Sequence, residues 1–305
     1  MRKIFITGAG GCVGHYLFDV LAGDLSNELY LLVRDPAKLK FNPAAYPNVK
    51  IIKDDLKNIR AHADLLKQMD QVVHLAADWA WHEGNLDYSL DLFELLDPAK
   101  CYKAIYFSTA SILGPDNKPV IEAEKFGTNY VQGKYRFHQK LPSLKIYPRV
   151  VTLFPTWVLG GDDRHPRSHA TQGIIELKKW LRLIRFITFD ASFHFIHAQD
   201  IAAIVKYLLE NEVKEKEFVL GNAPITANQF LKEVCAYYKV PVYFQLPVKA
   251  GLVRFLAALF RQPLLPWDRY CLERRNFVFQ TVNAATFRLP PGLETVPGVL
   301  RAIDS

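Results

Sequence analysis

The sequence predicts an α/β fold, a doubly wound parallel sheet with a smaller C-terminal lobe. Short apolar runs alternate with stretches of helical spacing through the first half of the chain, as in βαβ units. These runs lack polar alternation, which is typical of strands covered on both faces. From about Pro155 onward, loops rich in Gly, Asp and Pro separate the helical stretches, so we expect a smaller unit there.

The predicted elements of the first half follow one another in a regular order. The strands are short runs of mostly apolar residues at Lys3–Thr7, Glu28–Val33, Val49–Ile52, Gln71–Leu75 and Ala104–Ser108. Apolar residues at helical spacing predict helices over Cys12–Ala22, Ile59–Lys67 and Tyr88–Leu96. Because helices stand between successive strands, we expect those strands to be parallel.

The composition excludes a disordered chain. Of the 305 residues, 50% are hydrophobic and 13% aromatic, which is enough to bury a large core. No apolar run reaches the roughly 18–20 residues that a membrane span needs. The four cysteines lack CxxC spacing, so we predict no disulfide framework, no zinc site and a cytoplasmic protein. The net charge of +7 permits an anionic partner without choosing among nucleotide, nucleic acid and lipid.

A glycine-rich turn, TGAGGCVG, joins the first predicted strand to the first helix. Glycine lets the backbone turn tightly and approach a pyrophosphate bound to the N–H groups at the helix start. Directly after a strand, this pattern predicts a dinucleotide site. The candidate contacts are Thr7, Gly8, Gly10, Gly11, Cys12, Val13 and Gly14.

The end of the second strand distinguishes NADP from NAD. An acidic residue there binds the ribose 2′-hydroxyl, whereas a cation accommodates a 2′-phosphate. Arg34 is the first residue after the strand, and its planar guanidinium pairs well with phosphate. We therefore predict NADP, with NAD as the alternative. An Arg34–Asp35 pair facing solvent is the structural alternative to a phosphate site.

Two further strand ends supply candidate cofactor contacts. After the third strand, a carboxylate or backbone group can meet the adenine, and after the fourth, small residues let the cofactor lie against the backbone. The candidates are Asp54, Asp55 and Leu56 after the third strand, and Leu75, Ala76 and Ala77 after the fourth.

The catalytic candidates begin with a tyrosine and a lysine at helical spacing. Tyr130 and Lys134 are four residues apart, on one face of a predicted helix. A phenol with an ordinary pKa near 10 transfers protons poorly at neutral pH. A nearby Lys⁺ and an oxidised nicotinamide favour the phenolate and bring that pKa into range. A YxxxK pair alone is usually a solvated helix face.

A hydroxyl-rich turn strengthens this interpretation. Ser108 and Thr109 leave the fifth strand, and Thr109 precedes Tyr130 by 21 residues. Ligands of doubly wound sheets bind at the carboxyl ends of the strands, so these hydroxyls are expected to face the cofactor crevice. Thr109 can then hold a substrate oxygen while Tyr130 moves the proton.

Together these motifs resemble the extended short-chain dehydrogenase/reductase superfamily, the NAD-dependent epimerase/dehydratase family. The resemblance continues in Phe154–Gly160, Phe195–Ala202 and Phe218–Gly221, which are similar to the family's RPxxVYG, FVHVxDVA and YNLG segments. It implies that Thr109 orients the substrate, that Tyr130 is the acid/base, and that Lys134 binds the nicotinamide ribose and lowers the pKa of Tyr130. It also implies cofactor contacts at Ser108, Tyr130, Lys134, Pro155, Thr156, Trp157 and Val158.

Departures from the family pattern narrow the expected reaction. Ala110 and Ser111 stand where similar sugar 4,6-dehydratases carry an Asp-Glu pair, which argues against dehydration. Trp157 stands where nucleotide-sugar enzymes usually carry Asn. The VRDP turn at Arg34 resembles dihydroflavonol-reductase-like and 3β-hydroxysteroid-dehydrogenase-like branches, which act on apolar ketones or alcohols.

We therefore expect an NAD(P)-dependent oxidoreductase that passes a hydride between nicotinamide and a carbonyl or secondary alcohol of a small, apolar substrate. One alternative is a nucleotide-sugar epimerase; another is a non-catalytic NADP-binding sensor or assembly factor. The expected Rossmann domain spans residues 1–155, with 195–221, a predicted helix over Phe195–Leu209 and a predicted strand over Glu217–Leu220, rejoining it. Residues 156–194 and 222–305 form the expected substrate-binding lobe. A homodimer is left open.

Two segments of the second half combine cations with apolar residues. On a helical wheel, Ile174–Arg185 places its Lys and Arg residues on one arc and its apolar residues on the other; Lys249–Arg261 has a similar character. Either the apolar arc faces the core, or the segments form a patch that contacts a membrane surface. The aromatics are not interleaved with the cations, so we expect no nucleic acid. His194 and His197 point to opposite faces of a strand, so no metal site is predicted.

Overall fold

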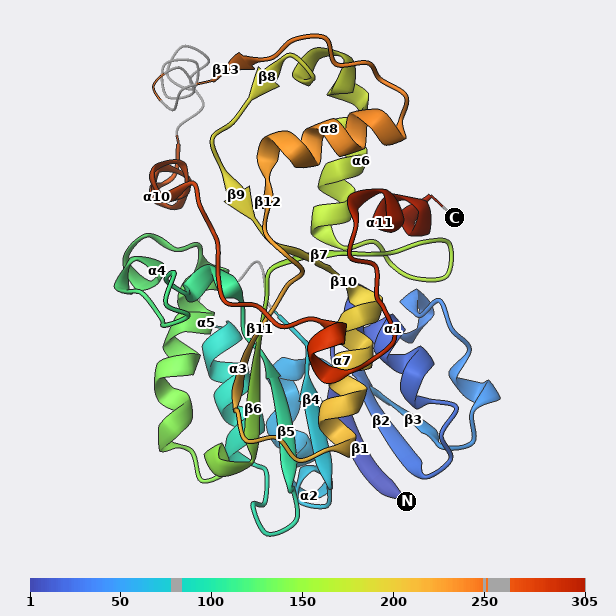
Figure 1. The fold of residues 1–305 in the computed structure, drawn as a ribbon. Helices are drawn as coiled ribbons and strands as arrows, with labels where there is room; N and C mark the ends of the chain where they lie inside the picture. The colour runs from blue at the N-terminus through green and yellow to red at the C-terminus, as the bar shows by residue number, and fades with distance from the viewer. Residues whose placement is uncertain (78–83, 249–250, 252–263, 305) are drawn as a thin grey trace.

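The computed structural model describes residues 1–77, 84–248, 251 and 264–304. Its centre is a seven-stranded sheet in the order β11-β6-β5-β4-β1-β2-β3, in which every neighbouring pair is parallel. The strands are β1 (Arg2–Thr7), β2 (Asn27–Val33), β3 (Val49–Lys53), β4 (Gln71–His74), β5 (Lys103–Phe107), β6 (Val150–Pro155) and β11 (Glu217–Leu220). The predicted doubly wound parallel sheet is confirmed (Figure 1).

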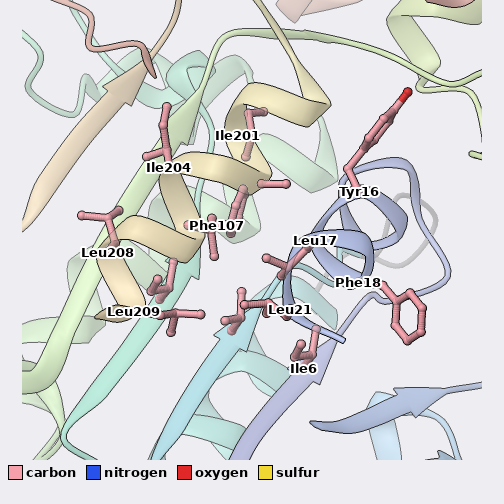
Figure 2. Packing of buried hydrophobic residues seen from close by; sticks show 14 of the residues in the cluster. Ile6, Tyr16, Leu17, Phe18, Leu21, Phe107, Ile201, Ile204, Leu208 and Leu209 are labelled. Atoms are coloured by element: carbon pink, nitrogen blue, oxygen red, sulfur yellow. The ribbon is translucent and has the colours of Figure 1, made fainter. Parts of the chain in front are cut away.

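Helices cover both faces of this sheet. On one face α1 (Cys12–Leu21) and α7 (Ala198–Glu210) lie side by side, and Ile6 of β1 packs beneath them (Figure 2). Ile4 belongs to the same buried cluster. On the other face lie α3 (Gly84–Glu94) and α5 (Asn129–Lys140), which pack in the same cluster as Phe5. Successive β1 residues therefore face opposite layers, which explains why the strand shows no polar alternation.

Two predicted helices differ in the structure. Ile59–Lys67 is mostly 3₁₀-helix, since η3 spans Leu56–His62 and only α2 (Ala63–Leu66) is α-helical. The Asp55 carboxylate accepts the Lys57 N–H and starts this tight turn. The helix expected over Phe195–Leu209 begins at Ala198, because Phe195–His197 form strand β10, which pairs with β7 (Trp157–Leu159) and not with the main sheet.

Helices and short β-ribbons of the second half form a separate lobe above the main sheet, which we call the upper lobe (Figure 1). Its helices are α6 (His169–Ile184), α8 (Ala227–Tyr237), α10 (Pro266–Arg274) and α11 (Val296–Ile303). Its ribbons pair β9 (Ser192–Phe193) with β12 (Ile225–Thr226) and β8 (Ile187–Thr188) with β13 (Leu246–Pro247). Leu181, Phe230 and Leu300 belong to its buried cluster.

The C-terminal segment is not confined to the lobe. Val282 N donates to Val219 O at 2.8 Å, and the ring of Phe287 in η7 (Ala284–Phe287) lies 5.2 Å from that of Tyr207 on α7. The segment then returns to the lobe as α11 (Figure 1). Apart from Gly251, the predicted basic and apolar segment Lys249–Arg261 lies outside the described residues.

The remaining short elements lie mainly in loops. They are η1 (Pro36–Lys38), η2 (Pro43–Ala45), η4 (Ala110–Ile112), α4 (Ile121–Phe126), η5 (Leu141–Ser143) and η6 (Tyr147–Arg149). None of the described helices combines the length and the apolar sequence needed to cross a membrane.

Candidate active site

The glycine-rich turn forms a cradle at the start of α1. Gly8 has φ +77°, and a Cβ there would lie 2.7 Å from Ala76 N; a Cβ on Gly14 would lie 2.3 Å from Gly8 O. Only glycine fits these two positions. A Cβ on Gly10 would meet nothing within 4 Å. The turn therefore packs tightly against the end of β4, while the space at Gly10, above the start of α1, is free. This arrangement suits the binding of a dinucleotide pyrophosphate.

The side chains of Cys12 and Val13 turn away from this opening. Cys12 Sγ would lie 3.3 Å from a Cβ on Gly160, and burial raises the pKa of its thiol to about 12. Val13 packs against the cluster beneath α1 and α7. Both residues can therefore meet a cofactor through their backbone N–H groups.

A buried histidine, which was not among the predicted site residues, fixes the end of β4. His74 Nδ1 lies 2.7 Å from Thr7 Oγ1, and its Nε2 lies 2.9 Å from Ser89 Oγ. Burial and the nearby Lys134 charge hold the pKa of His74 well below its usual range. Thr7 Oγ1 also accepts the Ala76 N–H at 3.2 Å, and Thr7 O accepts the Leu75 N–H at 3.2 Å. These bonds set Leu75–Ala77 beside the glycine turn.

Arg34 stands open beyond the end of β2. Its side chain is 81% exposed, and its Nη1 lies 4.0 Å from Asp55 Oδ2. Asp35 is not its partner; Asp35 Oδ1 accepts the Ala37 N–H at 3.2 Å and caps η1. The expected alternative of an Arg34–Asp35 pair is therefore wrong.

The Asp54 carboxylate is engaged within its own turn. It accepts hydrogen bonds from Asn58 Nδ2 at 2.7 Å and Asp55 N at 2.7 Å, and its Oδ2 lies 2.8 Å from His62 Nε2. The Asn58 bond, with those of His62 and Asp55, lowers the pKa of Asp54 to about 2. Leu56, the first residue of η3, packs with the cluster on the α3 side of the sheet.

Thr109, Tyr130 and Lys134 come together at the carboxyl end of β5. The Tyr130 phenol hydrogen-bonds with Thr109, and Lys134 Nζ lies 6.0 Å from the centre of the Tyr130 ring. Tyr130 is the second residue of α5, whose N-cap Thr128 accepts the Val131 N–H at 3.4 Å. The helix and the strand end thus place a phenol, a hydroxyl and an ammonium in one cluster.

Burial shifts the pKa values of both ionisable groups of this cluster, Tyr130 and Lys134. It raises the pKa of Tyr130 to about 12, while the hydrogen bond with Thr109 acts in the opposite direction. It lowers the pKa of Lys134 to about 7. Lys134 Nζ donates to Phe107 O at 2.7 Å and lies 4.8 Å from the centre of the Tyr106 ring. The phenol is therefore protonated at neutral pH, with a buried lysine behind it. The resemblance implies that Lys134 lowers the pKa of Tyr130, but in the structure burial raises that pKa.

The hydroxyl-rich turn is held by its own side chains. Thr109 is the N-cap of η4, and its Oγ1 accepts the Ser111 N–H at 3.2 Å and donates to Ser111 Oγ at 3.2 Å. Ser108 N donates to Leu153 O at 2.8 Å, which ties the turn to β6. Thr109 therefore keeps a fixed orientation at the end of the strand.

The segment Pro155–Val158 leads from the main sheet into the lobe. Thr156 Oγ1 donates to Leu220 O at 2.8 Å, and Trp157 N donates to His194 O at 3.2 Å. The Trp157 side chain is 51% exposed and stacks on Phe193, with ring centroids 4.5 Å apart. Val158 O accepts the Ser168 hydroxyl at 2.7 Å. The segment thus presents an exposed aromatic surface.

C-terminal aromatic residues complete the surroundings of Tyr130. Phe277, Phe279 and Trp267 pack in the same apolar cluster as Tyr130. Arg274 covers two of these rings, at 4.5 Å from Phe277 and 5.5 Å from Phe279. No local sequence signal connects these residues with the YxxxK helix, about 140 positions earlier, because only the tertiary fold brings them together.

His194 and His197 belong to separate hydrogen-bond networks. His194 Nδ1 lies 2.6 Å from Asn222 O, and its Nε2 accepts the Phe279 N–H at 3.0 Å. His197 is the N-cap of α7, where its Nδ1 accepts the Gln199 N–H at 3.2 Å. Burial lowers the pKa of His197 to about 4. Both residues act as parts of the scaffold between sheet and lobe.

Several solved structures share this fold over nearly the whole chain. The crystal structure of gox2253 is 22% identical, with a TM-score of 0.74, and 99% of this chain and 98% of that chain are covered. The UDP-N-acetylglucosamine 4-epimerase from Methanobrevibacter ruminantium M1, in complex with UDP-N-acetylmuramic acid, is 20% identical, with a TM-score of 0.66 and 99% and 96% covered. The UDP-glucose 4-epimerase from Thermus thermophilus, in complex with NAD, is 15% identical, with a TM-score of 0.65 and 98% and 96% covered.

The family model gives the most direct comparison. No curated protein sequence matches the chain. The model of the NAD dependent epimerase/dehydratase family matches residues 4–221, which hold the glycine turn, the YxxxK helix and strand β11. The chain therefore belongs to the NAD dependent epimerase/dehydratase family, of the extended short-chain dehydrogenase/reductase type, and is an NAD(P)-binding enzyme.

Proposed function

We propose that this enzyme is an NADP(H)-dependent oxidoreductase that interconverts a carbonyl group and a secondary alcohol on an apolar substrate. The observation that carries the proposal is the cluster of Thr109, Tyr130 and Lys134 at the end of β5, in which Lys134 Nζ lies 6.0 Å from the centre of the Tyr130 ring. A phenol whose pKa is about 12 holds its proton at neutral pH and gives it up only as negative charge develops on a substrate oxygen. This suits carbonyl reduction.

Thr109, Tyr130 and Lys134 each have a separate role in the proposed reaction. When bound, the dinucleotide supplies the hydride for the carbonyl carbon. Thr109 holds the carbonyl oxygen, and Tyr130 donates its proton to that oxygen as the alcohol forms. Lys134, anchored by Phe107 O at 2.7 Å, stabilises the phenolate left on Tyr130. In the oxidation direction the same phenolate takes the alcohol proton.

Arg34 supports NADP over NAD. Its guanidinium is 81% exposed at the end of β2 and lies 4.0 Å from the Asp55 carboxylate, a separation typical of a weak surface pair. The end of β2 is where this fold meets the ribose 2′ position. An exposed, weakly paired arginine there can turn to a 2′-phosphate at little cost.

Aromatic side chains support an apolar substrate. The stacked Trp157–Phe193 pair stands where the main sheet leads into the lobe. Phe277 and Trp267 pack in the cluster that contains Tyr130. Sites that accept apolar ligands are lined in this way, with few polar groups.

A nucleotide-sugar epimerase is the second candidate. The observation that favours it is the similarity to nucleotide-sugar 4-epimerases. The two candidates differ in stoichiometry: a reductase consumes one NADPH for each product, whereas an epimerase inverts a stereocentre without net consumption of cofactor. Trp157, in place of the Asn usual in nucleotide-sugar enzymes, supports the reductase.

The test is a Tyr130→Phe variant, with Tyr135→Phe on the same helix as the matched control. NADPH oxidation is followed with a series of apolar ketones and aldehydes, and UDP-glucose is assayed separately for inversion. We expect Tyr130→Phe to lower turnover by at least about 10²-fold, while NADPH affinity stays within a few fold. Tyr135→Phe should keep near-normal activity. Near-normal turnover by Tyr130→Phe, or inversion of UDP-glucose without oxidation of NADPH, contradicts the proposal.

A further inference from the structure

The tip of the upper lobe exposes an unusual set of large apolar side chains. The end of α6 carries Trp180 and Leu183, which are 60% and 65% exposed. The segment that leads into β13 carries Tyr243, Phe244 and Leu246, which are 79%, 58% and 62% exposed. Figure 1 places both segments at the end of the molecule opposite the N-terminus.

These two segments pack against each other, and we call them the lobe tip: residues 176–189 and 239–248. The rings of Phe186 and Phe244 stack with centroids 4.9 Å apart. Leu246 N donates to Phe186 O at 2.7 Å, and Val248 N donates to Thr188 O at 2.9 Å. The exposed side chains are therefore held in place by a small ribbon.

The helix pattern alone does not account for this exposure. Ile174 and Leu181 of α6 are buried in the lobe core, as an amphipathic helix requires. Trp180 and Leu183 belong to the arc that the sequence assigns to the apolar face, yet they point into solvent. Several large apolar side chains gathered on one exposed patch mark an interaction surface.

Cations accompany these apolar residues. The lobe tip contains Lys178, Lys179, Arg182, Arg185 and Lys239 against the single acid Glu176, a net charge of +4. Glu176 pairs with Lys179 at 2.7 Å. Arg185 packs its guanidinium 4.5 Å from the Phe186 ring, and Lys178 lies 4.1 Å from the Tyr238 ring. Cationic and aromatic groups thus share one surface.

We infer that the lobe tip docks on the surface of an anionic phospholipid bilayer. Trp and Tyr prefer the headgroup region, because their rings are apolar and their N–H and O–H groups reach water. Lys and Arg reach lipid phosphates along apolar stems. An excess of positive charge beside exposed Trp, Leu and Phe suits the negative surface of such a bilayer, whereas a neutral protein partner would give the cations nothing to pair with.

Vesicle co-flotation of the full chain tests this inference. The probes are vesicles of phosphatidylcholine alone and of phosphatidylcholine with phosphatidylglycerol, at low and high salt. We expect binding to the anionic vesicles and a marked loss of binding at high salt. Trp180→Ser combined with Leu183→Ser, and separately Arg182→Glu, should each weaken binding by roughly tenfold or more.

The matched controls lie far from the lobe tip. Leu25→Ser changes a leucine that is 62% exposed between α1 and β2, and Lys214→Glu changes an exposed lysine beyond the end of α7. Both should bind vesicles like the unchanged protein. NADPH affinity should be the same in every variant, which shows that each is folded and keeps this test independent of the proposed reaction.

Three outcomes overturn the inference. The unchanged protein fails to bind anionic vesicles, or it binds neutral and anionic vesicles alike, or the tip variants bind as the controls do. Sedimentation measurements separate a further case. A dimer that the Trp180→Ser and Leu183→Ser changes abolish, without vesicle binding, would assign the lobe tip to self-association.

Discussion

At the scale of single residues, the proposed preference for NADP depends on Arg34. Its weak pair with Asp55, at 4.0 Å, costs little to break, and a phosphate would gain a charge-assisted contact. Arg34→Ala should therefore weaken NADPH binding by roughly tenfold or more and leave NADH binding within about twofold. Fluorescence titration with each dinucleotide measures both affinities.

Lys38 provides the control for this prediction. It is 82% exposed and lies 4.0 Å from Asp35, so it offers the same charge near the same strand end. Lys38→Ala should change NADPH affinity less than Arg34→Ala does. Equal losses of NADPH and NADH affinity in Arg34→Ala would reject the assignment of a 2′-phosphate site.

Among the site residues, those joined by local geometry could be predicted. Tyr130 and Lys134 share a helix face because they are four residues apart, and Thr109 follows a strand whose end had to face the crevice. His74 carried no such signal, because its hydrogen bonds to Thr7 and Ser89 join three separate segments. The pairing of Arg34 with Asp55 also has no local signal, because it depends on β2 and β3 lying next to each other in the sheet.

At the scale of elements, the loop between β7 and α6 is fastened to α1 by His165. Its Nδ1 lies 2.8 Å from the Asp162 carboxylate, and its Nε2 lies 2.8 Å from Asp19 Oδ2. Its ring stacks on Tyr16 at 3.8 Å, and the residue is 3% exposed. His165→Ala should therefore lower the free energy of unfolding by about 2–4 kcal/mol, because it removes a buried ring and one of the side chains that hydrogen-bond Asp162.

Urea unfolding measures this loss, and Asp19→Ala is the comparison. Asp19 is half exposed, so water replaces most of what its carboxylate gives up, and its loss should cost about 1 kcal/mol or less. If His165→Ala and Asp19→Ala cost the same, His165 does not anchor the loop through burial.

Helix α6 also shows what the periodicity of apolar residues cannot predict. The apolar spacing of α6 predicts a helix, and the helix forms, but periodicity cannot tell which apolar residues meet the core. Leu181 is buried while Trp180, its neighbour, is 60% exposed. Leu181 lies in the same buried cluster as Phe230 and Leu231 of α8, a helix that is far from α6 in sequence.

At the scale of the whole molecule, the first five strands of the sheet could be predicted, whereas β6 was not predicted as a strand and the path of the C-terminal segment could not be predicted. Each of these five strands is a separate apolar run in the sequence, and the right-handed crossover connections between them make the strands parallel. Val282 and Phe287 contact β11 and α7 through pairings more than 60 residues apart, which no local pattern encodes. The segment thereby joins sheet, α7 and lobe.

Asp200 provides a further contact with this segment, and it makes stability depend on pH. Asp200 Oδ2 accepts the Leu293 N–H at 3.0 Å, and burial raises the pKa of Asp200 to about 6, with the nearby Glu294 charge acting in the same direction. A raised pKa means that the folded protein binds this proton more tightly than the unfolded chain does. Its contribution is thus fully present below about pH 4 and is lost as the pH rises through about 6.

Asp200→Asn keeps an acceptor for Leu293 and removes the titrating group. Relative to the unchanged protein, this variant should gain free energy of unfolding as the pH rises from about 4 to about 6, by up to about 3 kcal/mol, and the difference should then stay constant. Buried histidines such as His74 and His197 titrate alike in both proteins, so the difference isolates Asp200. Urea unfolding at a series of pH values measures it. A difference that does not change between pH 4 and 6 would show that the carboxyl is not the group that links the C-terminal segment to pH.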